Sequence, residues 1–242
     1  MSMTTTEDRP PMAPPPVVAV SGLIFSALFI GSLVLFRLAV PADPKEPGDW
    51  IADASLRNWV GFALNLIPFT GIAFLWFMGV LRNRIGGHED RFLATVFLGS
   101  GLLFVAMLFV GSAVSQGLLD TFAIESRLPS ESETYAALRA AGYALLTIFA
   151  VKMAAVFIFV TSTIGLRTAV FPRWMAFVGY AFALVMLLMI KGFGWIALAF
   201  PTWVLILSVY ILVTDIGQGR QLAKAAAARP PRQSVPAGAA EH

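Results

Sequence analysis

The stretch Ala140–Leu166, AAGYALLTIFAVKMAAVFIFVTSTIGL, decides how the rest of the chain is interpreted. Its only charged residue is Lys152, and it is longer than the roughly 20 apolar residues that an α-helix needs to cross a hydrocarbon core of about 30 Å. A helix satisfies its own backbone hydrogen bonds, whereas each unpaired peptide group in lipid costs several kcal/mol. The stretch therefore predicts a membrane-spanning helix.

The composition of the whole chain points to the same class. Of the 242 residues, 58% are hydrophobic and 13% are charged, which leaves too little polar surface for a soluble domain. Cysteine is absent, so disulfides, thiolate metal sites and cysteine nucleophiles are excluded. We therefore expect an all-α integral membrane protein that contacts the lipid bilayer.

Further apolar segments predict a polytopic transmembrane helical bundle of about six spans. The predicted spans are Val17–Val40, Trp59–Leu81, Phe92–Leu119, Ala140–Leu166, Trp174–Ile190 and Trp195–Thr214. Together they form one transmembrane domain, residues 17–214. Residues 1–16 are predicted to be a disordered, proline-rich tail. Residues 215–242 are predicted to be a basic, Ala/Pro-rich tail, in which Gln218–Ala228 extends the last helix.

The charges between the predicted spans alternate in sign. The turns around Arg84 and Arg173 and the C-terminal tail are basic, whereas the loops around Asp49 and Glu131 are acidic. Lys and Arg concentrate on cytoplasmic loops of membrane proteins. The alternation therefore predicts that the basic turns and both termini are cytoplasmic.

Lys152 is the residue that suggests a binding site. It lies near the middle of its predicted span, where a cation costs about 2.5–3.5 kcal/mol on insertion scales. We expect it to face the bundle interior, a water-filled cavity or a hydrogen-bond acceptor. No carboxylate lies comparably deep in another span, so its expected partners are neutral: Asn65, Thr70, Ser112, Ser115, Gln116, Thr147 or a carbonyl freed by Pro68.

Two functional interpretations remain open. In the first, the protein handles a small molecule or an ion, as a transporter or ligand sensor, and the ligand binds at Lys152 with Asn65, Thr70, Ser112, Ser115 and Gln116. In the alternative, Lys152 is tolerated at a helix interface of a non-enzymatic accessory or assembly subunit, whose partner is another membrane protein. A polar cavity reaching Lys152 would favour the first interpretation. A closed bundle with a wide small-residue face outward would favour the second.

Several chemistries lack a starting motif. The chain has no Gly-x-Ser-x-Gly elbow, no His-Glu-x-x-His pair and no P-loop, so an enzyme is unsupported, although it is not excluded. Its histidines are His88 and His242, which do not support haem ligation or a histidine-rich metal site. We predict no cofactor and no metal. Aromatic residues do not interleave the basic tail, so nucleic acid is not an expected partner.

Two features of the spans predict how the helices pack. Gly111 and Ser115 form a small-xxx-small pair, which lets another helix approach closely. Trp76 and Trp203 lie deep in their spans and are expected to pack between helices. The remaining predicted anchors lie near span ends, at the membrane interface: Trp59, Trp174 and Trp195.

Four short motifs carry a resemblance to a known group of proteins. They are Leu64-Asn65-Leu66-Ile67-Pro68-Phe69, Phe74-Leu75-Trp76-Phe77, Glu89-Asp90-Arg91-Phe92 and Phe171-Pro172-Arg173-Trp174. With them the chain resembles uncharacterised polytopic membrane proteins of actinobacteria and related bacteria, a family of unknown function. The resemblance implies about six helices in a bacterial inner membrane and adds no catalytic residue.

Overall fold

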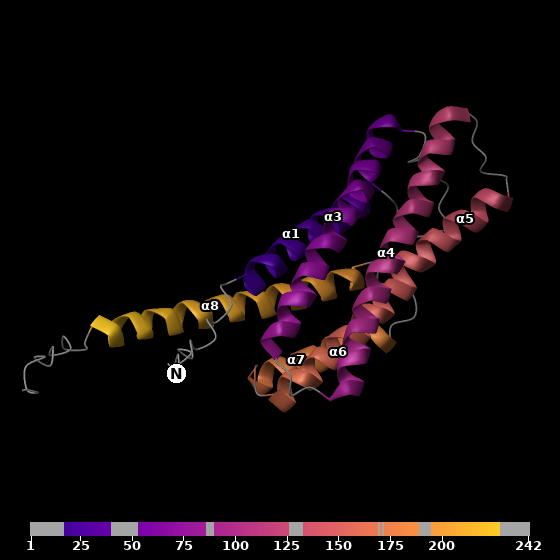
Figure 1. Ribbon diagram of the computed structural model, residues 1–242. Coiled ribbons are helices and arrows are strands. Elements are labelled where there is room, and N and C mark those ends of the chain that lie inside the picture. The colour runs from indigo at the N-terminus through magenta and orange to yellow at the C-terminus, as the bar shows by residue number, and fades with distance from the viewer. Residues whose placement is uncertain are drawn as a thin grey trace, which may run out of the picture.

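The computed structural model describes residues 17–39, 53–85, 90–125, 133–168, 170, 172–188 and 195–227, and the secondary structure within these residues is helical (Figure 1). The elements in chain order are α1 (Val17–Ala39), α3 (Ala54–Ile85), α4 (Arg91–Glu125), α5 (Glu133–Ala144), the π-helix η2 (Leu145–Phe149), α6 (Ala150–Thr168), α7 (Arg173–Leu188), the 3₁₀-helix η3 (Ile196–Leu198) and α8 (Ala199–Ala227). The predicted all-α bundle is confirmed.

Five helical segments are long and apolar enough to cross a membrane. They are α1, α3, α4, the continuous run from α5 through η2 to α6, and the run from η3 into α8. Helix α7 is also apolar but has only 16 residues. Helix α8 continues to Ala227, which confirms that the last helix extends into the basic tail. The chain is therefore a multi-pass membrane protein.

The helices pack as antiparallel neighbours. Helix α1 lies against α3 and α8, α4 lies against α3, α5 and α6, and α6 lies against α7. Two ion pairs join the helices at one end of the bundle. Arg84 of α3 pairs with Asp215 of α8, and Arg167 of α6 lies 3.7 Å from the carboxylate of Asp90. We call this the basic end, and the opposite end the distal end.

A cluster of phenylalanine rings fills the centre of the bundle. Phe74 of α3 has its ring centroid 5.1 Å from those of Phe25, Phe104 and Phe157, which come from α1, α4 and α6. Edge-to-face and tilted pairs of this kind add to the stability that burial alone provides. The rings in this phenylalanine cluster are those of Phe25, Phe29, Phe74, Phe77, Phe97, Phe104, Phe157 and Phe200, and all are at most 3% exposed.

The small-xxx-small pair of α4 does hold a neighbouring helix. A Cβ added at Gly111 would lie 2.7 Å from the Leu146 Cγ atom of η2, so a larger residue there would force one of the two helices to shift. A Cβ added at Gly142 of α5 would lie 3.0 Å from the Ser115 hydroxyl oxygen. The close approach predicted at Gly111 and Ser115 is thus confirmed, and α5 with η2 is the partner.

The tryptophans follow the expectation with one exception. Trp203 is 2% exposed and packs inside the bundle as predicted, but Trp76 is 68% exposed on the outer side of α3. The prediction for Trp76 was wrong because lipid-facing and protein-facing sides of a transmembrane helix are both apolar, so depth along the helix does not reveal direction. The three predicted interface anchors lie exposed near helix ends, as expected: Trp59, Trp174 and Trp195.

Candidate functional site

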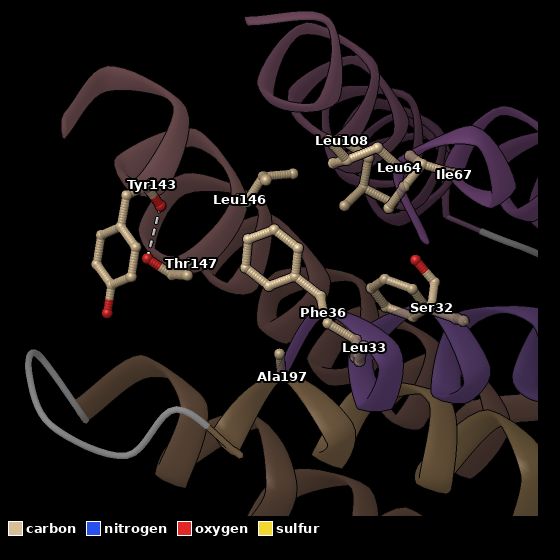
Figure 2. A pocket seen from close by; sticks show the side chains of 11 residues that line it. Ser32, Leu33, Phe36, Leu64, Ile67, Leu108, Tyr143, Leu146, Thr147 and Ala197 are labelled. Atoms are coloured by element: carbon tan, nitrogen blue, oxygen red, sulfur yellow. Dashed lines mark hydrogen bonds between the residues drawn. The ribbon is translucent and has the colours of Figure 1, made fainter. Parts of the chain in front are cut away.

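A pocket of about 50 Å³ lies in the half of the bundle toward the distal end (Figure 2). Its lining comes from the second half of α1, the first half of α3, the middle of α4, the junction of α5 with η2, and η3. Figure 2 shows the ring of Phe36 lying between the side chains of Leu146 and Ala197 in that view. The lining residues are Phe29, Ser32, Leu33, Phe36, Leu64, Ile67, Leu108, Tyr143, Leu146, Thr147 and Ala197.

The π-helix forms one wall of this pocket. The backbone N–H of Ala150 donates to the carbonyl of Leu145, five residues earlier, so the turn holds one residue more than an α-helical turn would. Leu146 and Thr147 of this turn both line the pocket. Single π-turns inside α-helices occur frequently at functional sites. This wall of the pocket is thus formed by a π-turn of the backbone and by the side chains of Leu146 and Thr147.

The polar atoms of the pocket are few, and two of its three side-chain hydroxyl groups are paired. The Ser32 hydroxyl donates to the Ala63 carbonyl at 2.8 Å and so links α1 to α3. The Thr147 hydroxyl donates to the Tyr143 carbonyl at 2.6 Å, beside the π-turn. Figure 2 shows the Tyr143 hydroxyl pointing away from the leucine side chains. The pocket therefore offers an apolar surface with no charged group among its lining residues.

Toward the basic end the bundle is closed. Phe29 borders the pocket and belongs to the phenylalanine cluster, which continues through Phe25 and Phe74. Beyond the cluster, Arg84 donates two hydrogen bonds to the Asp215 carboxylate, at 2.8 and 2.7 Å. Among the described residues, these contacts lie between the pocket and the basic end.

Lys152 does not line this pocket. Its Nζ atom donates to the carbonyls of Met186 and Leu187, at 3.0 and 2.5 Å, in the last turn of α7. The last four carbonyls of an α-helix lack partners within the helix, and a cation is stabilised there by the helix dipole. Lys152 thus caps α7. Both of these acceptors are neutral carbonyls, but the end of α7 was not among the partners that the sequence suggested.

The other predicted site residues hydrogen-bond within their own helices. Two lie on α3, where the Asn65 amide donates to the Gly61 carbonyl and the Thr70 hydroxyl to the Leu66 carbonyl. Three lie on α4, where the acceptors are again local: Ser112 donates to Phe109, Ser115 to Gly111 and Gln116 to the Asp120 carboxylate. A role for these residues and Lys152 in binding a ligand stays a prediction.

Sequence reasoning missed the pocket, and the signals for it are weak. Its apolar lining residues look like any other lipid-facing or core positions, and the π-turn carries no sequence mark of its own. The clue that was available is Gly111, because a small residue lets another helix approach closely, and the side chain that meets it, Leu146, lines the pocket.

Comparisons with protein-family models, curated proteins and solved structures find no match for this chain. In the part of the chain that the structure describes, no group of three or more His, Cys, Asp or Glu side chains gathers to hold a metal. Fold and site together define the class as a multi-pass helical membrane protein with an apolar pocket within its bundle.

Proposed function

We propose that the protein handles a lipid-like small molecule, as a ligand sensor or carrier, by binding its apolar chain in the pocket beside η2. The observation that carries this proposal is the pocket itself, because it lies within a membrane-spanning bundle and is lined mainly by apolar side chains. The surrounding solvent of such a pocket is lipid, so a hydrocarbon chain is both abundant and chemically matched.

The size of the pocket narrows the class of ligand. An engineered protein cavity of about 150 Å³ holds benzene, whereas a single water needs roughly 10–15 Å³. At about 50 Å³ the pocket takes a short segment of a chain. The remainder of the ligand then lies in the bilayer beside the protein, with its headgroup at the distal surface.

The closed basic end favours a sensor or carrier over an open pore. Passage along the bundle axis would require the phenylalanine cluster and the ion pair between Arg84 and Asp215 to separate. Binding from one side needs no such movement. Because positive residues favour the cytoplasm, we place the basic end inside and the pocket in the outer leaflet of the cell (inner) membrane.

Photolabelling tests the pocket directly. The protein is reconstituted with phosphatidylcholine that carries a diazirine in one acyl chain, irradiated, and mapped by peptide mass spectrometry. We expect enriched labelling of peptides containing Ser32–Phe36 and Tyr143–Thr147, relative to the exposed face of α7.

A pocket-filling variant provides the control. Ala197→Leu adds three carbon atoms to the lining, and Ala140→Leu adds the same atoms at an exposed position of α5. Ala197→Leu should lower labelling of the pocket peptides several-fold, whereas Ala140→Leu should leave it unchanged. Equal labelling of the pocket and the face of α7, or no effect of Ala197→Leu, would refute the proposed ligand site.

A further inference from the structure

The outward face of α3 carries a regular stripe of exposed residues. Its members alternate at spacings of three and four residues, which is the heptad pattern of a helix that packs against another helix with a left-handed crossing. We call this stripe the α3 seam, and its residues are Phe62, Asn65, Phe69, Ile72, Trp76 and Gly79. All six are exposed, and α3 contacts α1 and α4 through its other side.

Asn65 makes this seam unsuited to lipid. It lies about 7 Å along the axis from the middle of α3, at about 1.5 Å per residue, and so within the hydrocarbon core. A primary amide has two N–H donors and an oxygen with two lone pairs. Among the described residues, the Asn65 side chain uses one N–H, in its bond to Gly61, and its oxygen accepts no hydrogen bond. Lipid chains offer it neither donor nor acceptor.

Trp76 adds a second polar group to the same seam. Its side chain is 68% exposed, and its indole N–H finds no acceptor among the residues that the structure describes. Indole N–H groups in membrane proteins normally lie at the interface, where water or headgroups accept the bond. Trp76 instead lies about 10 Å from the middle of α3, at about 1.5 Å per residue, on the side of the basic end.

We propose that a second copy of this chain covers the α3 seam, in a dimer with two-fold symmetry about the membrane normal. All copies insert with the same orientation, so their α3 helices would pack parallel and each seam residue would meet its own counterpart at the same depth. Asn65 would then face Asn65 of the second copy, and two amides can each donate and accept. A different partner would need a matching polar group at that depth.

Glycine on the seam supports a close approach. A Cβ added at Gly79 would meet nothing within 4 Å, so the surface there is open, and small residues let backbones of transmembrane helices come near each other. A polar residue at one position of a heptad seam also fixes register and the number of strands. Gly79 and Asn65 together favour a dimer in which the two α3 helices pack in one fixed register.

Disulfide trapping tests the pair, because the natural chain has no cysteine. The Ile72→Cys variant places a thiol on the seam, and Leu102→Cys places one on an equally lipid-exposed position of α4. After mild oxidation in liposomes at low protein density, Ile72→Cys should give a covalent dimer at twice 26.1 kDa. Equal or absent crosslinking at the two positions would overturn the proposed interface.

The contribution of the amide is tested in the same background. Asn65→Val added to Ile72→Cys should lower the dimer association constant about 3- to 10-fold, the range that interhelical hydrogen bonds in membranes support. Asn58→Val makes the same change one heptad earlier, beside the interfacial Trp59, and should have little effect. Circular dichroism confirms that each variant folds. Unchanged association with Asn65→Val would refute pairing through this residue, and the pocket proposal would stand unaffected.

Discussion

Arg84 and Asp215 are separated by 131 positions in the sequence, yet their side chains form a bidentate ion pair that joins α3 to α8. The side chains are 23% and 21% exposed, so water screens them only in part. A guanidinium matches a carboxylate with two parallel hydrogen bonds, which is the strongest arrangement of this kind. The pair therefore links α3 to α8 at the basic end of the bundle.

Asp215→Asn should destabilise the protein by about 1–3 kcal/mol, because the Arg84 cation loses its charged partner. The measurement is the midpoint of thermal unfolding in one fixed detergent. Arg82→Gln is the matched control, since Arg82 is exposed in the same helical turn, and should change the midpoint little. A double variant that exchanges the two charges should recover part of the loss; an Asp215→Asn protein as stable as the natural one would show that the pair adds nothing.

Lys152→Met should loosen the end of α7, because Met186 and Leu187 lose the donor to their carbonyls. We expect a loss of about 1–3 kcal/mol, the range for a hydrogen bond to a charged group. Faster amide exchange of the residues that follow Met186 would localise the effect. Lys152→Arg keeps the charge and donors and should retain more stability. If Lys152→Met leaves exchange and stability unchanged but alters binding of the diazirine lipid, Lys152 acts on the ligand instead.

Gly111→Val should disrupt the contact between α4 and η2, because a side chain there collides with Leu146 close to its backbone. Overpacking of this kind costs about 1–3 kcal/mol. Gly99→Val on the same helix is the control, since a Cβ at Gly99 meets nothing within 4 Å. Thermal unfolding of both variants compares them under identical conditions. Equal midpoints would contradict the tight helix contact at Gly111.

Asp53 predicts a pH dependence at the start of α3. The hydroxyl and the backbone N–H of Ser55 donate to its carboxylate, at 2.7 Å each, and hold the pKa of Asp53 below its ordinary value of 3.8. A lowered pKa in the folded protein stabilises it at neutral pH, and this contribution is lost as the pH falls from about 4 through the folded-state value. The first turn of α3 should then exchange its amides faster relative to the rest of the helix.

The Asp53→Asn variant supplies the comparison for that measurement. Asparagine also caps helices but does not titrate in this range. Its relative exchange should stay constant between neutral pH and pH 3. The same acid-induced change in both proteins would assign the effect to other carboxylates.

The all-helical fold and the approximate positions of the spans were predictable because lipid imposes helices on apolar runs. An apolar run such as Ala140–Leu166 has to be helical, and the structure places it in a helix that runs from Glu133 to Thr168. The small residues Gly111 and Ser115 also identified a real contact. In both cases the feature depends on residues of a single helix, so it can be recognised within a short stretch of sequence.

The direction of each side chain was less predictable. In water an apolar face identifies the core, but in lipid both faces are apolar, so Trp76 was assigned inward and lies outward. The acceptors of Lys152 depend on where α7 ends beside α6. This position cannot be predicted from the sequence of either helix alone. The pocket arises in the same way, from five separate segments and one π-turn.

Helix α7 also affects the lipid around the protein. Its 16 residues extend about 24 Å at 1.5 Å per residue, less than a hydrocarbon thickness of about 30 Å. Helix α4, by contrast, has 35 residues and exceeds that thickness. A bilayer therefore has to thin where it meets α7 but not where it meets α4, and such hydrophobic mismatch costs fractions of a kcal/mol per Å. The protein should concentrate in thinner regions of the membrane and adopt a tilt toward its short side.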